Sequence, residues 1–358
     1  MSINNGDEPP LRRRPRSPTL ANVAAAAGVS VSTAGRVLRD QGWPVEESLK
    51  ERVRVAASEL GYVPNLMART LRAGAPALVG LVIGNMLDPY YGEIAEAVTC
   101  YSEANSHMLT MVCNMQRDPQ LELDYCRRLW EHRVAGLILA GGGFDQFTYQ
   151  AELAQLVEKM ERSGVVVATL SPRDLDIPSF HVDNVEVGRR AARELISMGH
   201  RSIGILVGPI RNRVLTQRIT GITEICTEEG VATYLAVTEF GAPWVAPAIA
   251  QMFEERPSIT AVIAASGVTS INVVGAVTAT GRTVPHDISV IGIGGKAISE
   301  WATPQVSRVD LGLEICGRAA LDHIVARVEG DRRAPDFYLE PVVVGGETIA
   351  APKECTAD

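Results

Sequence analysis

The sequence predicts a small all-helical head followed by a much larger α/β body. The chain has 358 residues, more than one ordinary domain needs. Residues 19–61 carry apolar side chains at helical spacing between glycine stops, and after residue 76 short apolar runs alternate with amphipathic stretches. Such alternation is typical of parallel sheets that helices cover on both faces. The expected divisions are a disordered basic arm at 1–18, a helical domain at 19–63, a short helix with linker at 64–75, and the body at 76–358.

The charge is unevenly distributed along the chain. The formal net charge is -8, yet residues 1–74 have a net charge of about +4, which leaves the remainder strongly acidic. A basic head on an acidic body favours contact between the head alone and a polyanion. The arginines of the arm stand among prolines, which predicts disorder; a merely solvated tail is the alternative for Arg12, Arg13, Arg14 and Arg16.

Three helices are expected in the head. The first covers 19–27 and ends at Gly28, the second runs from Ser30 as its N-cap to about residue 38, and the third covers 46–60. Two short helices joined by a glycine turn have helix-turn-helix geometry, in which the second helix enters the DNA major groove. The spacing alone fits a helix hairpin that only packs a core nearly as well.

The residue pattern separates these two interpretations. "TLANVAAAAGVSVSTAGRVLR" and "ERVRVAASELGYVPNLMARTLRAG" resemble the N-terminal domain of the LacI/GalR family of bacterial transcription regulators. The resemblance implies base contacts by Val31 and Ser32 at the start of the recognition helix, and by Arg36 one turn later. It also implies phosphate contacts by Thr19, Leu20 and Thr33. Arg36 is expected to be the strongest reader, because a guanidinium group pairs with guanine O6 and N7, whereas Val31 offers only methyl contact to thymine.

The head departs from the family pattern in three places. Gly35 replaces a serine, which costs about 1 kcal/mol of helix propensity. Arg39 replaces an asparagine and is a further candidate for a phosphate or base contact. The loop "DQGWPVEE" is one residue longer than the common one. The operator sequence therefore does not transfer from a relative.

Residues 64–74, "PNLMARTLRAG", resemble the hinge helix of the same family. In the family this segment folds only on DNA, where paired hinge helices insert a leucine into the minor groove. The resemblance implies that Leu71 is the wedge and that Asn65, Ala68 and Arg69 line the groove. A linker with a hydrophobic docking residue is the alternative.

The body contains strand-sized apolar runs at 78–83, 108–113, 136–141, 165–170, 203–208, 261–265 and 289–293. Helical stretches lie between them, for example at 120–131, 187–198 and 313–328. Ligands of such folds bind beyond the carboxyl ends of the strands.

This stretch is similar to the effector domain of the LacI/GalR family, from "GLVIGNMLDPYYGEIAEAV" through "VDNVEVGRRAARELISMGHRSIGILVGP" to "PQVSRVD". The resemblance implies a two-lobed, doubly wound α/β domain of the type I periplasmic-binding-protein kind, with the ligand between the lobes. One lobe is expected at 76–173 with 309–333, and the other at 176–305 with the C-terminal strands.

The same resemblance implies the residues of an effector site. These are Asp88, Tyr90 and Tyr91 in the "DPYY" loop, the polar Arg173, Asp183, Asn184 and Arg218, a stacking Trp244, and Ser266 and Gly294. The last two are departures, because relatives carry Asn-Asp at 266–267 and Asp-Asp at 294–295 where this chain has Ser-Gly and Gly-Gly. Their loss predicts a larger pocket. A sugar or glycoside is ranked first as ligand, a sugar phosphate or sugar acid second, because an arginine could pair with its anion, and a purine third.

Other classes of protein fit the sequence less well. None of the enzyme motifs HExxH, GxSxG or P-loop occurs, so no catalytic residue, metal site or cofactor is predicted. The N-terminus has no apolar signal segment and no run long enough for a membrane span, which predicts a cytoplasmic protein rather than an exported binding protein. The six scattered cysteines are expected to be free thiols. A ligand-free architectural DNA-binding protein is opposed by the two-lobed body.

The resulting hypothesis is a homodimeric repressor on a pseudo-palindromic operator, released by a small-molecule inducer. The opposite sign, a corepressor that strengthens DNA binding, stays open. The C-terminus shows no heptad repeat, so a dimer is the default.

Overall fold

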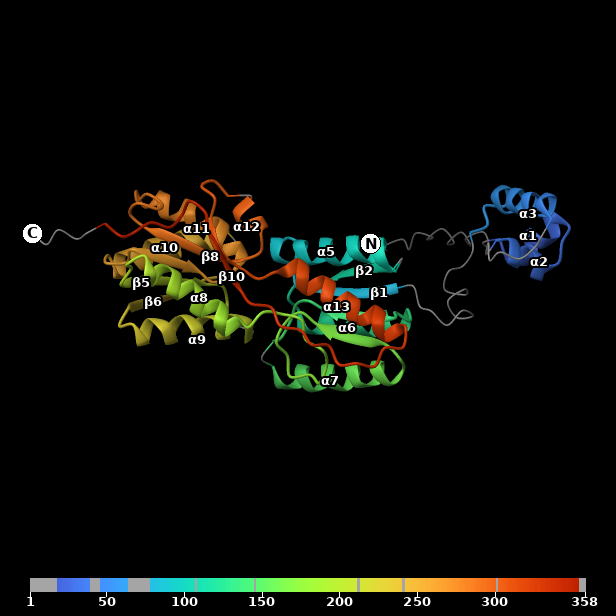
Figure 1. Ribbon diagram of the computed structural model, residues 1–358, viewed down its shortest axis with the longest axis horizontal. Coiled ribbons are helices and arrows are strands. Elements are labelled where there is room, and N and C mark those ends of the chain that lie inside the picture. Colours follow the sequence, from blue (N-terminus) through green and yellow to red (C-terminus); the bar gives the residue numbers. More distant parts are fainter. Residues whose placement is uncertain are drawn as a thin grey trace, which may run out of the picture. The chain divides into compact units, whose positions relative to one another are not determined.

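The computed structural model describes residues 18–38, 46–63, 78–106, 108–144, 146–210, 213–239, 242–300 and 302–353. The chain divides into two compact units, Met1–Gly74 and Ala75–Asp358, which are called the head and the body below (Figure 1). The expected contacts of Arg39, Asn65, Ala68, Arg69 and Leu71 fall outside the described residues. Within the described part of the chain, no helix is both long and apolar enough to cross a membrane.

The head consists of α1 (Leu20–Ala27), α2 (Val31–Val37) and α3 (Glu47–Glu59), close to the expected bounds. Thr19 and Asn22 form a capping box at the start of α1, and Gly28 ends the helix with a left-handed φ of 64°. The hydroxyl oxygen of Ser30 accepts a hydrogen bond from the backbone N–H of Thr33 at 3.1 Å and so caps α2. The expected helix pair with its glycine turn is therefore confirmed.

A core of small side chains holds the three helices together. Its buried members come from all of them and are Val23, Ala24, Ala27, Ala34, Val37, Val53, Ala56 and Ala57. Arg52 of α3 donates a hydrogen bond to the carbonyl oxygen of Ala27 at the end of α1. Because alanines allow the helices to approach closely, a core this small can fix the angle between α1 and α2.

The first lobe of the body is a four-stranded parallel sheet in the order β2-β1-β3-β4. Its strands are β1 (Leu78–Ile83), β2 (Leu109–Asn114), β3 (Gly136–Leu139) and β4 (Val166–Thr169). Helices α5 (Pro89–Asn105), α6 (Pro119–Glu131) and α7 (Phe147–Arg162) connect them, and α13 (Leu313–Val328) returns to this lobe and packs on α5.

The second lobe is a six-stranded sheet in the order β10-β9-β8-β7-β5-β6. Its strands are β5 (Ser202–Val207), β6 (Ala232–Val237), β7 (Ala261–Ala264), β8 (Ser289–Gly294), β9 (Ser307–Asp310) and β10 (Val342–Val344). Its helices are α8 (Asn184–Ser197), α9 (Arg213–Glu228), α10 (Ala242–Glu255), α11 (Gly267–Ala279) and α12 (Ala297–Glu300). The chain passes between the lobes after β4, after β9 and before β10, so the crossovers lie side by side between the sheets (Figure 1).

The second sheet of the body differs from the expectation in several strands. The strands β6 and β9 are absent from the expected runs. The edge strand β6 is mostly apolar, with alternating exposure, and was missed. The strand β9 lies inside the sheet but has Ser307, Arg308 and Asp310 around a single valine. The strand β10 is antiparallel to β9, so the second sheet is not purely parallel. The expected lobe boundary at residue 309 is wrong, because β9 belongs to the second sheet and the crossover begins after Asp310.

Candidate functional site: an exposed helix of the head and a pocket between the lobes

In the head, α2 presents the residues expected to read bases. Val31 is 50% exposed, and Ser32 and Arg36 are exposed as well, whereas Ala34 and Val37 on the opposite side are buried. The capping hydroxyl of Ser30 lies 2.8 Å from the hydroxyls of both Ser32 and Thr33. The cap that starts the helix therefore also orients the hydroxyls at its first turn. Ser30 was expected only as a cap, so this link was missed.

The two expected phosphate contacts at the start of α1, Thr19 and Leu20, differ in whether their polar groups already have hydrogen-bond partners. The Thr19 hydroxyl donates to the side-chain oxygen of Asn22 at 2.6 Å and accepts from the Asn22 backbone N–H at 3.3 Å. The backbone N–H of Leu20 is one of the first N–H groups of α1, which a helix leaves without partners of its own. A phosphate oxygen at this end would meet such N–H groups rather than the proton of Thr19.

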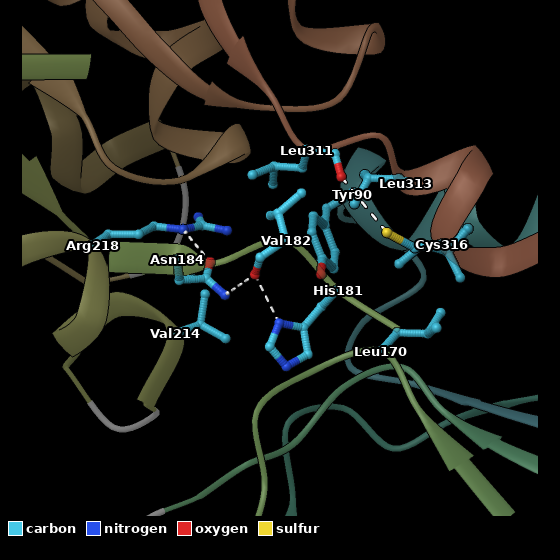
Figure 2. A pocket seen from close by; sticks show the side chains of 11 residues that line it. Tyr90, Leu170, His181, Val182, Asn184, Val214, Arg218, Leu311, Leu313 and Cys316 are labelled. Carbon is cyan, nitrogen blue, oxygen red and sulfur yellow. Dashed lines mark hydrogen bonds between the residues drawn. The ribbon is translucent and has the colours of Figure 1, made fainter. Parts of the chain in front are cut away.

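In the body, a pocket opens between the lobes at the crossovers (Figure 2). It is lined by residues from α5, α8, α9, α13 and the crossovers, namely Tyr90, Ile94, Leu170, His181, Val182, Asn184, Val214, Arg218, Leu311, Leu313 and Cys316. Leu170 follows β4 and Leu311 follows β9, so the pocket lies at carboxyl ends of strands from both sheets, as the fold rule predicts. The cavity measures about 20 Å³, the space of one or two water molecules.

Arg218 is the charged centre of this pocket. It is 4% exposed, and its guanidinium group donates to the Asn184 side-chain oxygen at 3.0 Å and to the Ala265 carbonyl oxygen at 2.9 Å. Among the described residues no carboxylate lies within ion-pair distance of it. Burial lowers the pKa of Arg218 to about 10, and the nearby Tyr90, Tyr91 and Asp88 only partly oppose this shift. The group stays charged at neutral pH, and within the described part of the chain no carboxylate is paired directly with it.

The pocket has a polar rim on the crossover that follows β4 (Figure 2). The side-chain N–H of Asn184 donates to the carbonyl oxygen of Val182 at 3.3 Å, and Nδ1 of His181 lies 2.7 Å from the same oxygen. Asn184 thereby connects Arg218 to the crossover. Cys316 faces the pocket from α13, where its thiol lies 3.8 Å from the Leu311 carbonyl oxygen. Burial raises the pKa of Cys316 to about 12, so it lines the pocket as a neutral thiol.

The aromatic loop at the start of α5 is packed rather than open. Tyr90 lines the pocket, and its ring meets that of Tyr91 edge-on, with centroids 4.9 Å apart. Burial raises the pKa of Tyr90 to about 12. Asp88 caps α5 through the backbone N–H of Tyr90 at 3.1 Å and accepts from Arg117 at 2.8 Å. Its carboxylate is thus already engaged, although burial raises its pKa.

The remaining expected effector residues lie outside the lining of this pocket. Asp183 is exposed and caps α8, Trp244 is 55% exposed at the start of α10, and Ser266 caps α11 beside the Ala265 carbonyl that Arg218 contacts. Gly294 ends β8 and is buried. Of the expected residues, Tyr90, Asn184 and Arg218 line the pocket, and Asp88 and Tyr91 lie close behind them.

Arg173 lies in a separate buried cluster of the first lobe. Its guanidinium group donates to Glu122 of α6 at 2.6 Å and to the Tyr149 hydroxyl oxygen of α7 at 3.1 Å. The Tyr149 hydroxyl in turn donates to Glu122, and Arg173 also donates to the Gly141 carbonyl oxygen. Burial works to lower the pKa of Arg173, but the Glu122 carboxylate more than offsets it and the pKa is raised. The expectation that Arg173 offers its charge to a ligand anion does not fit this pairing.

Several pocket residues were missed from the sequence. His181 and Val182 directly precede the Asp-Asn pair that resembled the family, and Leu311 and Leu313 directly follow "PQVSRVD". The signal was their position at the crossovers. Apolar residues there resemble ordinary core residues, so only the folded arrangement identifies them as a pocket wall. Across the described residues, no group of three His, Cys, Asp or Glu side chains could hold a metal ion.

Comparisons with known proteins match both units of the chain. Residues 19–65 match the model of the bacterial regulatory proteins, lacI family, and residues 192–349 match that of a periplasmic binding protein-like domain. The chain is 30% identical to the HTH-type transcriptional regulator CelR of Thermobifida fusca over 90% of this chain and 95% of the relative. It is 27% identical to the HTH-type transcriptional repressor PurR of Proteus mirabilis, over 93% and 97% of the two chains.

Solved structures show the same architecture. The lac repressor dimer bound to operator and the anti-inducer ONPF superposes with a TM-score of 0.79 at 22% identity, covering 94% of this chain and 100% of the other. The CelR–cellobiose complex gives a TM-score of 0.64 at 26% identity, covering 92% and 99%. Helix-turn-helix head, two-lobed body and sequence identity all agree, and the chain belongs to the lacI family of bacterial regulatory proteins, as a transcriptional regulator with a DNA-binding head and an effector-binding body.

Proposed function

We propose that this regulator is a cytoplasmic homodimeric repressor without enzymatic activity, whose two α2 helices read a pseudo-palindromic operator and whose body binds a small-molecule inducer. The observation that carries the proposal is the combination, on one chain, of an outward-facing α2 with a buried, uncompensated Arg218 between the lobes. The first supplies a reading surface, and the second supplies a ligand-sensing charge. Binding between the lobes changes their relative angle and so controls the DNA-binding state.

The head is proposed to read DNA through Val31, Ser32 and Arg36, with Thr19, Leu20 and Thr33 at phosphates. The exposure of α2 and the fixed hydroxyls of Ser32 and Thr33 support this assignment. Arg39, Asn65, Ala68, Arg69 and Leu71 are proposed as the further contacts that the family resemblance implies, with Leu71 as the minor-groove wedge.

A sugar or glycoside is the proposed ligand, and Arg218 and Asn184 are its proposed polar contacts. A relative, CelR, has been solved in complex with cellobiose, which favours a disaccharide. A sugar phosphate or sugar acid is the second candidate, because Arg218 could pair with its anion, and a purine is the third. Tyr90 would supply an aromatic surface. Asp88, Tyr91, Asp183, Trp244, Ser266 and Gly294 remain candidates that would need the pocket to open further.

The test of the DNA-binding proposal begins with selection of duplexes from a random pool by the full-length protein. We expect a two-fold symmetric consensus sequence. Arg36→Ala should then relax base preference at one position of each half-site and cost about 1–3 kcal/mol on the selected duplex. Arg54→Ala, an exposed arginine of α3, is the matched control that removes the same charge.

The control separates reading from simple charge attraction. Both variants should lose affinity for random DNA to a similar extent, because that affinity comes from phosphate contacts and salt. Only Arg36→Ala should lose discrimination between the selected and random duplexes. Failure to enrich any sequence at any salt concentration would refute the repressor proposal.

A further inference from the structure

A carboxylate joins the two lobes at a point outside the pocket lining. The helix α5 of the first lobe packs against α12 of the second, and the two are neighbours in Figure 1. Glu93 of α5 accepts a hydrogen bond from the backbone N–H of Lys296 at 3.1 Å and from that of Ala297 at 2.7 Å. Each carboxylate oxygen receives one of these bonds. Charge-assisted bonds to two successive N–H groups make this a directional contact across the lobes.

Gly295 makes the contact possible. A Cβ atom at this position would lie 2.1 Å from Oε2 of Glu93 and 2.5 Å from its Cδ, closer than any real contact. Any side chain at 295 would therefore displace the carboxylate. The residues that were expected to enlarge the pocket by their small size have a different effect here, because the space beside Gly295 is filled by Glu93 from the opposite lobe.

The pocket beside Arg218 needs more room than this arrangement gives. Its cavity of about 20 Å³ holds one or two waters, whereas pockets for small organic ligands measure roughly 300 Å³ or more. The lining comes from both lobes, including Tyr90 and Ile94 of α5, the helix that carries Glu93. A change in the angle between the lobes would widen the cavity and pull Glu93 away from α12.

We propose that Glu93 and Gly295 form a latch that holds the lobes in this narrow-pocket orientation. Glu93 is a positioning residue in this role, since it lies outside the pocket lining and acts through α5 and α12. The latch sets the cost of opening the pocket, because the two hydrogen bonds must break before the lobes separate. The proposal concerns the body alone and goes beyond the proposed function of the whole chain.

Hydrogen–deuterium exchange of the full-length protein, followed by mass spectrometry without added ligand, tests the latch. In Glu93→Ala, we expect the peptide containing the Lys296 and Ala297 amides to exchange at least tenfold faster than in the wild type. Peptides from the pocket wall, around 181–186 and 311–316, should exchange at least threefold faster because the lobes open more often. Glu93→Gln keeps one accepting oxygen and should give intermediate rates.

Two further variants make the result specific. Glu96→Ala removes an exposed carboxylate from the same helix and should leave every one of these peptides unchanged. Gly295→Ala disrupts the same contact from the second lobe. It should accelerate exchange in the same peptides as Glu93→Ala does. In the double variant, Gly295→Ala should add nothing, because the carboxylate that its methyl group displaces is already gone.

Three outcomes would overturn the latch. One is unchanged exchange at 296–297 in Glu93→Ala; another is faster exchange there with an unchanged pocket wall, which would make Glu93 a purely local contact. The third is full additivity of Glu93→Ala and Gly295→Ala. A melting scan confirms that each variant is folded. Operator selection by the wild type does not involve Glu93, so failure of the latch and failure of the proposed function are distinguishable.

Discussion

Two buried arginines of the body, Arg173 and Arg218, have opposite surroundings. The Arg173 side chain is 3% exposed and is paired with Glu122, whose side chain is fully buried. Arg218 is 4% exposed, and its hydrogen bonds to described residues go to neutral oxygens of Asn184 and Ala265. The pKa of Arg173 is raised above its ordinary value, whereas that of Arg218 is lowered to about 10. Burial is nearly equal, so the difference comes from the carboxylate.

The difference shows which arginine is available to a ligand. Burying a charge is costly unless it is paired, and the cost of Arg173 is offset within the protein by Glu122 and Tyr149. Arg218 retains most of that cost. A ligand that places oxygen atoms beside Arg218 would offset part of this burial cost. Contacts to Arg218 are therefore expected to contribute strongly to the free energy of ligand binding. The charge of Arg173 is already balanced, although its buried Nε has no hydrogen-bond partner among the described residues. Its contacts connect α6 and α7 to the loop that follows β4.

The largest effect is expected from removing the carboxylate that balances Arg173. Glu122→Gln should lower the free energy of unfolding of the body by about 3–5 kcal/mol, because it leaves a buried guanidinium without its counter-charge. Urea unfolding followed by circular dichroism measures this. The double variant Glu122→Gln with Arg173→Met should regain much of the loss. A loss in the double variant as large as in the single one would mean that shape rather than charge determines the stability of this site.

A smaller effect, and on a different property, is expected at the unpaired arginine. The ligand that releases operator from the wild type is first found by testing a set of sugars. Arg218→Gln should then need at least a 100-fold higher concentration of this ligand for release, which corresponds to about 2.7 kcal/mol. Operator affinity without ligand should stay within a factor of two. Stability should change little or rise, because the variant removes an uncompensated buried charge. Anisotropy titration of labelled operator with cellobiose, other glycosides and purine bases measures the response.

Arg213→Gln, on the same helix α9, is the matched control for Arg218→Gln. Arg213 forms an ion pair with Asp174 at the surface and lies outside the pocket that contains Arg218. Its variant should keep the wild-type response. Equal shifts in the two variants would indicate a general change in α9 and would remove Arg218 from the ligand site.

The hydroxyl of Tyr149 contributes less than the carboxylate that it supports. Tyr149→Phe should destabilise the body by about 1–2 kcal/mol, because Glu122 loses one donor and Arg173 one acceptor while the ion pair itself remains. Burial raises the pKa of Tyr149, so the hydroxyl is neutral in both acidic and neutral solution. The loss measured by urea unfolding should therefore be the same at pH 6 and pH 8. A loss confined to one pH would contradict a neutral donor.

The head was predictable in detail because its determinants are local. Thr19, Gly28 and Ser30 act on residues within a few positions of themselves, so the caps and the turn could be placed from the sequence. Most strands inside the sheets were predictable for a related reason, since burial on both faces leaves a continuous apolar run, and the polar β9 is the exception. The edge strand β6 was missed although its residues are mostly apolar.

The site in the body was predictable only in part because its determinants are distant. Arg173 and Arg218 looked alike in the sequence, and what separates them is Glu122, which lies 51 residues before Arg173. Glu93 and Lys296 are 203 residues apart, and nothing near either one signals the contact. The resemblance implied Tyr90, Asn184 and Arg218, which the structure places together in one pocket lining. It could not show which polar groups are already paired within the protein.

The smallest effect is expected where an arginine is paired but exposed. Asp174 and Arg213 form a side-chain ion pair, yet Asp174 is 58% exposed, so water already solvates both charges. Asp174→Asn should leave the unfolding free energy unchanged within error in moderate salt, in contrast to Glu122→Gln. Any small effect at low salt should vanish as salt is added, because screening acts on exposed charges. A salt-insensitive loss as large as that of Glu122→Gln would show that an ion pair contributes the same stability whether it is exposed or buried. The contrast between Arg173 and Arg218 could then not be explained by the burial of their charges.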